Sequence, residues 1–416
     1  TSSSCPRATD SEWLGPEERK LMRLATFQLL LTVLFLQCTI MTPAFAQVEV
    51  VIGGVEMESE AGVPGVLGDV DDSLEEQADE EEGKQRSWET VVAPIPARNP
   101  VFGWMISVPA MLMYKPSFSE PDDRVWISGL FGFYAENESW GAGLLQRMSF
   151  GGDRWRVMGA LFHAEMNYRY FGIGGEGGAS ILLDQDMDLG LAEGLRRVAP
   201  NFYLGLRGMY AETLVGPRLP ENTLPPGLDP DLLKVDLTLA TLAPRLQYDT
   251  RDNEFYPRSG LLVDATAAVS REAIGADLDY ERYDASINHY RPLGERGVLA
   301  SRIATQYTSG GTPFFLYPAF GQGADLRGYE MGSYRDRFLV AAQTEDRHRF
   351  TKRIGAAAFA GVGSVAPDFG GWEKSLWSVG AGLRWVVAPK NNVSLRVDIA
   401  RGRDETVYYV GVGQCV

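Results

Sequence analysis

Cysteine and histidine are both scarce in this chain, which has three of each among its 416 residues. Cys5 and Cys38 lie before residue 47, so Cys415 alone remains beyond that point and no internal disulfide is expected there. The three histidines are far apart in sequence, and none has a metal-ligand spacing. These absences argue against a disulfide scaffold, a zinc site and His-based nucleophilic chemistry, and no cofactor is predicted.

Long apolar runs and positive charge are also missing from most of the chain. After residue 46 no window offers 18 consecutive apolar residues, so no helical membrane span is predicted there. The formal net charge is -16, and residues 47–89 contribute most of it, with fourteen acidic residues against two basic ones. The remainder is close to neutral and shows no basic face, which excludes nucleic acid as a predicted partner.

Residues 1–46 are predicted to be a signal peptide with an upstream extension. Met22–Ala46 has a basic residue at its start, the apolar run LATFQLLLTVLFLQC, and Ala44-Phe45-Ala46 as a cleavage site. An uncleaved anchor helix is the weaker alternative, because small residues stand at 44 and 46. A lipoprotein signal at Cys38 is disfavoured because Gln37 occupies a position that requires a small residue. The chain is therefore predicted to be exported.

Residues 47–97 are predicted to form an acidic, disordered linker. The stretches EMESEAG and DVDDSLEEQADEEEGK combine high charge with few apolar residues, a composition typical of disorder. A calcium loop is the alternative, but DVDDSLEE lacks the alternating ligands and central glycine of such loops.

From residue 98 onward, segments of 10 to 16 residues alternate in polarity between clusters of turn-forming residues. Three examples are residues 186–191, 282–288 and 394–399. One face of these segments carries charges and glycine, and the other carries Trp, Tyr, Leu and Ile. In a membrane barrel the apolar face meets lipid and the polar face lines a wet lumen. Residues 98–416 are therefore predicted to be an all-β protein, a transmembrane antiparallel β-barrel.

The number of strands is predicted from a count of candidate segments. Fifteen candidate strands occur between residues 100 and 415, many of them long enough for the 9 to 11 residues that cross a bilayer. Single-chain bacterial barrels usually have an even number of strands. We predict 16, with the missing strand between Trp88 and Tyr114. Short connections are expected at the periplasmic side, and long ones, such as residues 309–336, at the extracellular side.

One of the long connections has an unusual composition. Residues 321–334, GQGADLRGYEMGSY, hold four glycines, one arginine and no apolar run. An ordinary surface loop is one interpretation. The alternative is a loop that folds back into the lumen, with Leu326, Arg327, Gly328 and Tyr329 as its core. A glycine that permits a sharp turn beside a single arginine favours the second interpretation.

Three motifs occur in order along the predicted barrel. The first is a turn between two strands, with Asp249, Arg251, Asp252, Asn253, Pro257 and Gly260. The second is the Arg-Gly-Tyr loop, and the third is the Glu-x-Arg strand of Glu345 and Arg347. In this combination, residues 98–416 resemble the bacterial surface antigen family, the BamA/TamA-type outer-membrane assembly and translocation barrels.

The resemblance implies a sixteen-stranded barrel whose loop arginine pairs with acidic residues on the strand walls. Carried over by motif, Arg327 is that arginine and Glu345 its best partner. The family usually shows an acid where this chain has Gly361, so Asp398 is a candidate for the second partner. The family also places POTRA domains before the barrel. No such pattern is recognisable in residues 47–97, which makes the chain resemble a short form without them.

The resemblance further implies a non-enzymatic function at the outer membrane of a bacterium. The barrel would assist the insertion or translocation of proteins, or of lipids, through a seam between its first and last strands. Outer-membrane lipid, nascent outer-membrane or secreted proteins and a separate periplasmic protein are the expected partners. A diffusion channel is the alternative, favoured by arginines on predicted lumen faces (Arg207, Arg282, Arg384 and Arg396). An outer-membrane hydrolase is a remote alternative, because no triad accompanies His163 or His289.

Overall fold

The computed structural model describes residues 49–52, 88–99, 102–170, 181–218, 234–312, 316–321, 325–329, 334–369 and 374–416. The predicted signal peptide and most of the predicted linker lie outside these ranges. In the described part of the chain, no helix has the length and hydropathy needed to cross a membrane.

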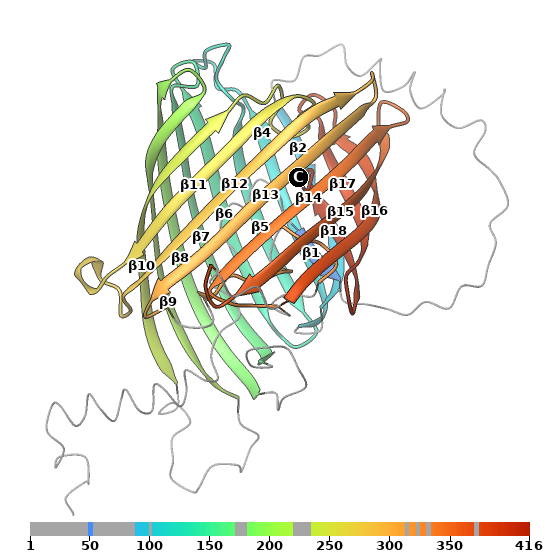
Figure 1. The fold of residues 1–416 in the computed structure, drawn as a ribbon. Helices are drawn as coiled ribbons and strands as arrows, with labels where there is room; N and C mark the ends of the chain where they lie inside the picture. Colours follow the sequence, from blue (N-terminus) through green and yellow to red (C-terminus); the bar gives the residue numbers. More distant parts are fainter. Residues whose placement is uncertain are drawn as a thin grey trace, which may run out of the picture.

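The described residues form eighteen strands in one sheet, which curves into a barrel (Figure 1). They are β1 (Glu49–Ile52), β2 (Trp88–Val92), β3 (Ile95–Asn99), β4 (Gly103–Tyr114), β5 (Trp126–Ala135), β6 (Trp140–Phe150), β7 (Trp155–Tyr170), β8 (Ile181–Ala199), β9 (Phe202–Pro217), β10 (Val235–Asp249), β11 (Gly260–Ser270), β12 (Tyr280–Leu293), β13 (Gly297–Gly310), β14 (Phe338–Arg349), β15 (Ile354–Ala366), β16 (Lys374–Ala388), β17 (Val393–Arg401) and β18 (Thr406–Val412). A short 3-10 helix, Glu272–Ile274, lies between β11 and β12.

The strands from β4 to β18 form a meander in which each strand pairs antiparallel with the next. Both β2 and β3 pair with β4, so they are two halves of one strand interrupted at Ala93 and Pro94. The amide of Ala93 still donates to the carbonyl of Pro109, at 3.1 Å, across the interruption. The predicted all-β membrane barrel is confirmed, whereas its closure and exact strand number stay predictions.

The sheet begins earlier in the sequence than the predicted boundary at residue 98. Strands β1, β2 and β3 all include residues of the predicted linker. Val91, Ala93 and Ile95 are buried and alternate with exposed neighbours, which is the period of a strand. Two five-residue strands separated by a proline carry too short a pattern to stand out next to a long acidic stretch.

Most strands near the C-terminus present apolar side chains outward and charged ones inward, as predicted. On β16 and β17, Leu383 and Ile399 are exposed, whereas their neighbours Arg384 and Asp398 are buried. A side chain that faces outward from this wall therefore meets lipid, and one that faces inward meets the lumen.

Strand β8 follows the opposite arrangement, which corrects the interpretation of residues 186–191. Asp186 and Asp188 are exposed on the outside, and Met187, Leu189 and Leu191 are buried. The reason is the length of this strand, which has 19 residues where about 11 suffice to cross a bilayer. In Figure 1 the green strands project beyond their neighbours, so outward carboxylates on this extension can meet water.

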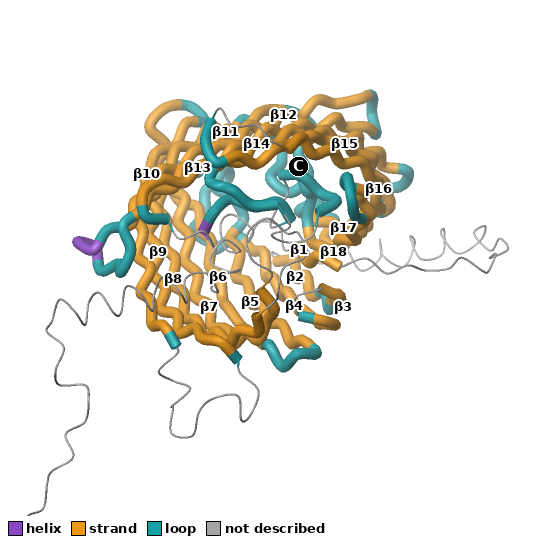
Figure 2. Tube along the Cα trace, turned by 60° about the horizontal axis from the view of Figure 1, so that its bottom comes forward, coloured by secondary structure: helices purple, strands orange, loops and turns teal. Residues whose placement is uncertain are grey.

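The interior of the barrel is occupied rather than empty. Figure 2 shows loop segments lying inside the ring of strands. One cluster of buried side chains joins loop residues Phe320, Leu326 and Tyr329 to Leu339, Ala341, Val365 and Leu376 of the wall. The connection between β13 and β14 therefore packs against the inner face of the sheet.

Candidate functional site

The loop between β13 and β14 returns into the barrel because its two legs pair with each other. Ala319 and Arg335 form an isolated antiparallel bridge. The amide of Phe320 donates to the carbonyl of Tyr334 at 3.0 Å, and the amide of Asp336 donates to Pro318 at 3.2 Å. These bonds hold the legs side by side and leave residues 325–329 at the tip. The predicted loop core thus lies where it can reach the lumen wall.

Arg327 is fully buried and bridges two carboxylates on different strands. Its two terminal nitrogens lie 2.6 Å from Oε2 of Glu345 on β14 and 2.7 Å from Oδ2 of Asp398 on β17. The guanidinium carbon also lies 3.3 Å from the ring centre of Phe359 on β15. Charge-assisted bonds of this length are among the strongest a guanidinium makes. The single loop arginine therefore connects three strands, β14, β15 and β17.

The glycine and the tyrosine that follow extend this connection to β16 and β18. The amide of Gly328 donates to the hydroxyl of Tyr409 at 2.6 Å, and that hydroxyl donates to the carbonyl of Tyr329. The hydroxyl of Tyr329 donates to the carbonyl of Trp377 at 2.7 Å. Gly328 has φ of +101°, and a Cβ there would lie 2.8 Å from the amide nitrogen of Gly402. Only glycine suits this position.

Leu326 explains why Gly361 stands where the resemblance implies an acid. A Cβ at Gly361 would lie 2.7 Å from a terminal methyl of Leu326, so the glycine makes room for the leucine. The second carboxylate reaches Arg327 from the neighbouring wall instead, through Asp398 on β17. The structure thus brings together Arg327, Glu345 and Asp398, the three residues that the sequence analysis grouped.

Further arginines surround the same two carboxylates. Nε of Arg347 lies 2.7 Å from Oε1 of Glu345. Arg384 contacts both acids, and Arg396 lies 3.3 Å from Asp398. Arg347 also donates to the carbonyl of Val416, which brings the buried Cys415 and Val416 close to this cluster. Each of the two carboxylates thus has several guanidinium partners, so their buried charges are compensated on the inner wall.

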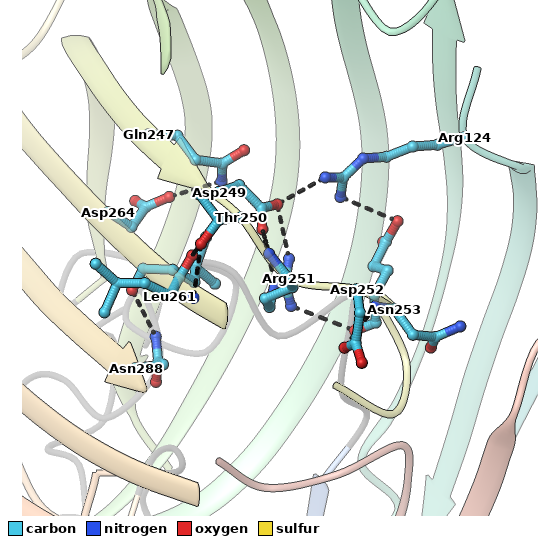
Figure 3. Close-up of polar contacts among 12 residues, drawn as sticks. Arg124, Gln247, Asp249, Thr250, Arg251, Asp252, Asn253, Leu261, Asp264 and Asn288 are labelled. Carbon is cyan, nitrogen blue, oxygen red and sulfur yellow. Dashed lines mark hydrogen bonds and ion pairs between the residues drawn. The ribbon is translucent and has the colours of Figure 1, made fainter. Parts of the chain in front are cut away.

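The predicted turn motif forms a second polar cluster between β10 and β11 (Figure 3). The carboxylate of Asp249 is buried and binds Nε of Arg251 at 3.0 Å. It also binds Arg124, from the connection between β4 and β5, at 2.7 Å. This turn and that connection both lie at the short-turn end of the barrel, opposite to the end from which the β13–β14 loop enters.

The other residues of the motif shape the turn itself. Oδ1 of Asp252 accepts bonds from the amides of Asn253, Arg258 and Ser259. Oδ1 of Asn253 accepts from two further amides, at 2.8 and 2.9 Å. Pro257 is buried, and Gly260 has φ of +109° with no room for a Cβ beside the carbonyl of Thr250. These are the bonds of a tight turn that fixes the position of Asp249.

Two more carboxylates complete the turn cluster, and neighbouring arginines keep both ionised. Burial of Asp153 would raise its pKa, but Arg156 and Arg124 beside it lower the value to about 2. Burial likewise opposes the ionisation of Glu254, yet Arg147, Arg124 and Arg251 lower its pKa to about 2. The cluster is therefore charged and paired throughout the neutral range.

Comparison with known families gives a match over part of this chain. Residues 223–404 match the Omp85 superfamily domain, and this range includes the turn motif, the loop core, Glu345 and Asp398. This segment, less than half of the chain, is similar to the Omp85 superfamily domain. A search of curated protein sequences gives no match.

Solved structures with a similar fold include two outer-membrane barrels. BamA from Haemophilus ducreyi, in a form lacking POTRA domains 1–3, matches with a TM-score of 0.51 and 16% identity. The match covers 82% of this chain and 77% of that one. CdiB from Escherichia coli matches with a TM-score of 0.53 and 11% identity, over 79% of this chain and 63% of its own. This chain therefore spans less than two thirds of the CdiB chain.

Several residues of the matched segment and its surroundings escaped the sequence analysis. Gln343 binds Arg327 and lies two residues before Glu345, so the strand period could have identified it. Phe359 is the aromatic residue of the stretch that contains Gly361. Tyr409 and Arg124 had no local signal, because their partners lie 81 and 125 residues away in sequence.

Proposed function

We propose that this protein is an outer-membrane barrel that assists the insertion or translocation of other proteins at that membrane. The observation that carries the proposal is the buried Arg327, held by Glu345 and Asp398 within the segment similar to the Omp85 superfamily domain. Its partners would be outer-membrane lipid, nascent outer-membrane or secreted proteins, and a separate periplasmic protein. Export through the signal peptide at residues 1–46 belongs to the same proposal.

The position of the loop supports a mechanism based on a seam. Residues 327–329 contact β14 to β18, which are the last five strands of the meander. These contacts attach the end of the sheet to the loop residues 327–329 in the lumen. The junction between the last strand and the first strands is then free to separate while the rest of the wall stays folded. Unpaired strand edges at such a junction can pair with an extended client segment.

The test is an insertion assay with purified protein in liposomes. A small urea-unfolded β-barrel is added, and its folding is followed by the shift of its unboiled band on a gel. Wild type is expected to shorten the folding half-time relative to empty liposomes, and Arg327→Ala to lose this effect. Arg291→Ala, at an exposed position of β12, is the matched control. Equal half-times with wild type and with empty liposomes would refute the proposal.

A diffusion channel remains the second candidate, because arginines do lie on the inner face. Arg207 pairs with Glu193 at 2.7 Å, and Arg282 pairs with Asp284 at 3.0 Å. These pairs reduce the positive charge that a selective anion pore would need. Steady single-channel conductance in planar bilayers, enlarged by deletion of residues 316–334, would favour the channel over the insertion function.

A further inference from the structure

The shortest strand of the sheet comes from the segment that precedes the barrel in sequence. Strand β1 pairs antiparallel with β18, with Glu49 opposite Gly411, Val50 opposite Val410, Val51 opposite Tyr409 and Ile52 opposite Tyr408. Residues 53–87 separate β1 from β2 along the chain. A four-residue piece from upstream of the barrel therefore lies on its last strand.

This pairing uses the remaining edge of β18. A strand has two hydrogen-bonding edges, and each can serve one neighbour at a given residue. At Tyr408–Gly411 one edge pairs with Arg396–Ile399 of β17. The other edge of the same residues pairs with β1. Strands β2 and β3 pair with β4, at the opposite end of the meander. At these four residues, β1 thus stands at the junction where the meander's end meets its beginning.

The contact is suited to exchange rather than to permanent closure. β12 and β13, within the wall, pair along the full 14 residues of β12, whereas β1 offers only four. Three of its four pairs with β18 set valine or isoleucine opposite valine or tyrosine in the register, and many extended apolar segments can reproduce such pairs. The receiving strand is itself held from the lumen, because the hydroxyl of Tyr409 binds the amide of Gly328. β18 can therefore keep its place while the strand on its edge changes.

We propose that Glu49–Ile52 is a placeholder that the chain itself supplies to the edge of β18. An extended apolar segment of a client protein would displace it and pair with Tyr408–Gly411 in its stead. The inference deepens the proposed insertion function, on which it rests, by naming the receiving edge and its resting occupant. Release of β1 would then be the step that makes the edge available.

The first test is disulfide trapping in the full chain, with Cys5, Cys38 and Cys415 replaced by serine. Val50→Cys with Val410→Cys places two cysteines at directly opposed positions of the ladder. Opposed Cα atoms of an antiparallel pair lie about 4.5–5.5 Å apart, which a disulfide can bridge. Val50→Cys with Val407→Cys, three residues out of register, is the matched control. On oxidation of intact outer membranes, we expect about ten-fold more cross-link for the first pair than for the second. Equal cross-linking of both pairs, or none, would overturn the inference.

The second test asks whether the edge can receive another strand. The probe is a synthetic peptide with the sequence of residues 47–54, QVEVVIGG, with a photoreactive residue in place of the second valine of its central Val-Val pair. A tethered strand has an effective concentration on the order of millimolar, so the peptide is used at that level. Val51→Pro weakens the β1 ladder and should raise labelling of β18 about five-fold, whereas Val63→Pro should not. Equal labelling of wild type and Val51→Pro would refute a displaceable placeholder.

The two tests also separate this inference from the insertion function. In the insertion assay, oxidised and reduced forms of the Val50→Cys and Val410→Cys protein are compared. Both proposals are supported if the cross-link forms only in the expected register and if oxidation, but not reduction, blocks insertion. Cross-linking and edge labelling as expected, but without insertion in either form, would leave the placeholder standing and refute the insertion function.

Discussion

Replacement of Arg327 tests the central contact of this structure. Arg327→Ala removes two bonds, of 2.6 and 2.7 Å, between fully buried groups. Removal of one partner from a buried ion pair typically costs about 3–5 kcal/mol. Glu345 and Asp398 keep Arg347, Arg384 and Arg396 as partners, so the lower end of that range applies. We expect a loss of about 3 kcal/mol.

Arg327→Lys separates geometry from charge. An ammonium is a point charge and cannot present two nitrogens to carboxylates on different strands, whereas the guanidinium does. The lysine variant should therefore lose one charged hydrogen bond, about 1.5–3 kcal/mol. It should also lose part of the contact with the ring of Phe359. Lysine should thus rescue less than half of the alanine defect.

The assay is the temperature at which the unboiled, fast-migrating gel band of the barrel disappears. For a chain of this size, a loss of 3 kcal/mol should lower that midpoint by roughly 3–5 °C, because the entropy of unfolding grows with chain length. Glu345→Gln together with Arg327→Ala should cost less than the sum of the single changes, because the two residues share one network. A lysine variant that melts like wild type, or an equal loss in the exposed control Arg291→Ala, would refute the reasoning.

Three further predictions concern the surroundings of this contact. Gly361→Asp introduces the acid that the family resemblance implies. It should nevertheless lower the melting midpoint by several degrees, because its Cβ would lie 2.7 Å from a methyl group of Leu326. The same gel assay measures this midpoint, and an unchanged value would contradict the packing argument. Tyr409→Phe removes the hydroxyl that binds Gly328 and Tyr329, at a cost of about 1–2 kcal/mol; it should speed proteolysis within residues 321–334, whereas Tyr408→Phe should not. The pKa values of Asp153 and Glu254 are about 2 in the folded protein against ordinary values of 3.8 and 4.5. The stability that these two carboxylates give the fold is therefore present above about pH 5 and lost as pH falls toward 2. Acid should lower the melting midpoint less in Glu254→Gln than in wild type. An equal fall in both proteins would count against this assignment.

The loop and its first partner could be predicted because their signals are local. Arg327 stands beside a glycine in a loop between two strands, and Glu345 lies on the next strand with its own motif. The place of Asp398 was a weaker inference, since 71 residues separate it from Arg327. Arg124 could not be predicted at all as a partner of Asp249, because strand curvature rather than sequence proximity brings them together.

The sequence by itself determined the class of fold and most of its inward and outward faces. Period-two alternation decides which side of a strand each residue occupies, and no tertiary information is needed for that. The alternation did not determine which face of a strand is the outer one and which lines the lumen. The carboxylates Asp186 and Asp188 alternate as lumen residues would, yet the length of β8 places them on the outside.

Only the tertiary structure decided which distant groups meet. The glycine at position 361 is explained by Leu326, which packs against it. The position of β1 in the sheet is known only from its register with β18. The physical reason is that a curved sheet brings its last strands, its lumen loop and an upstream segment to one place. Contacts of that kind depend on the closure of long chain segments, and residue order alone does not encode which of them pack.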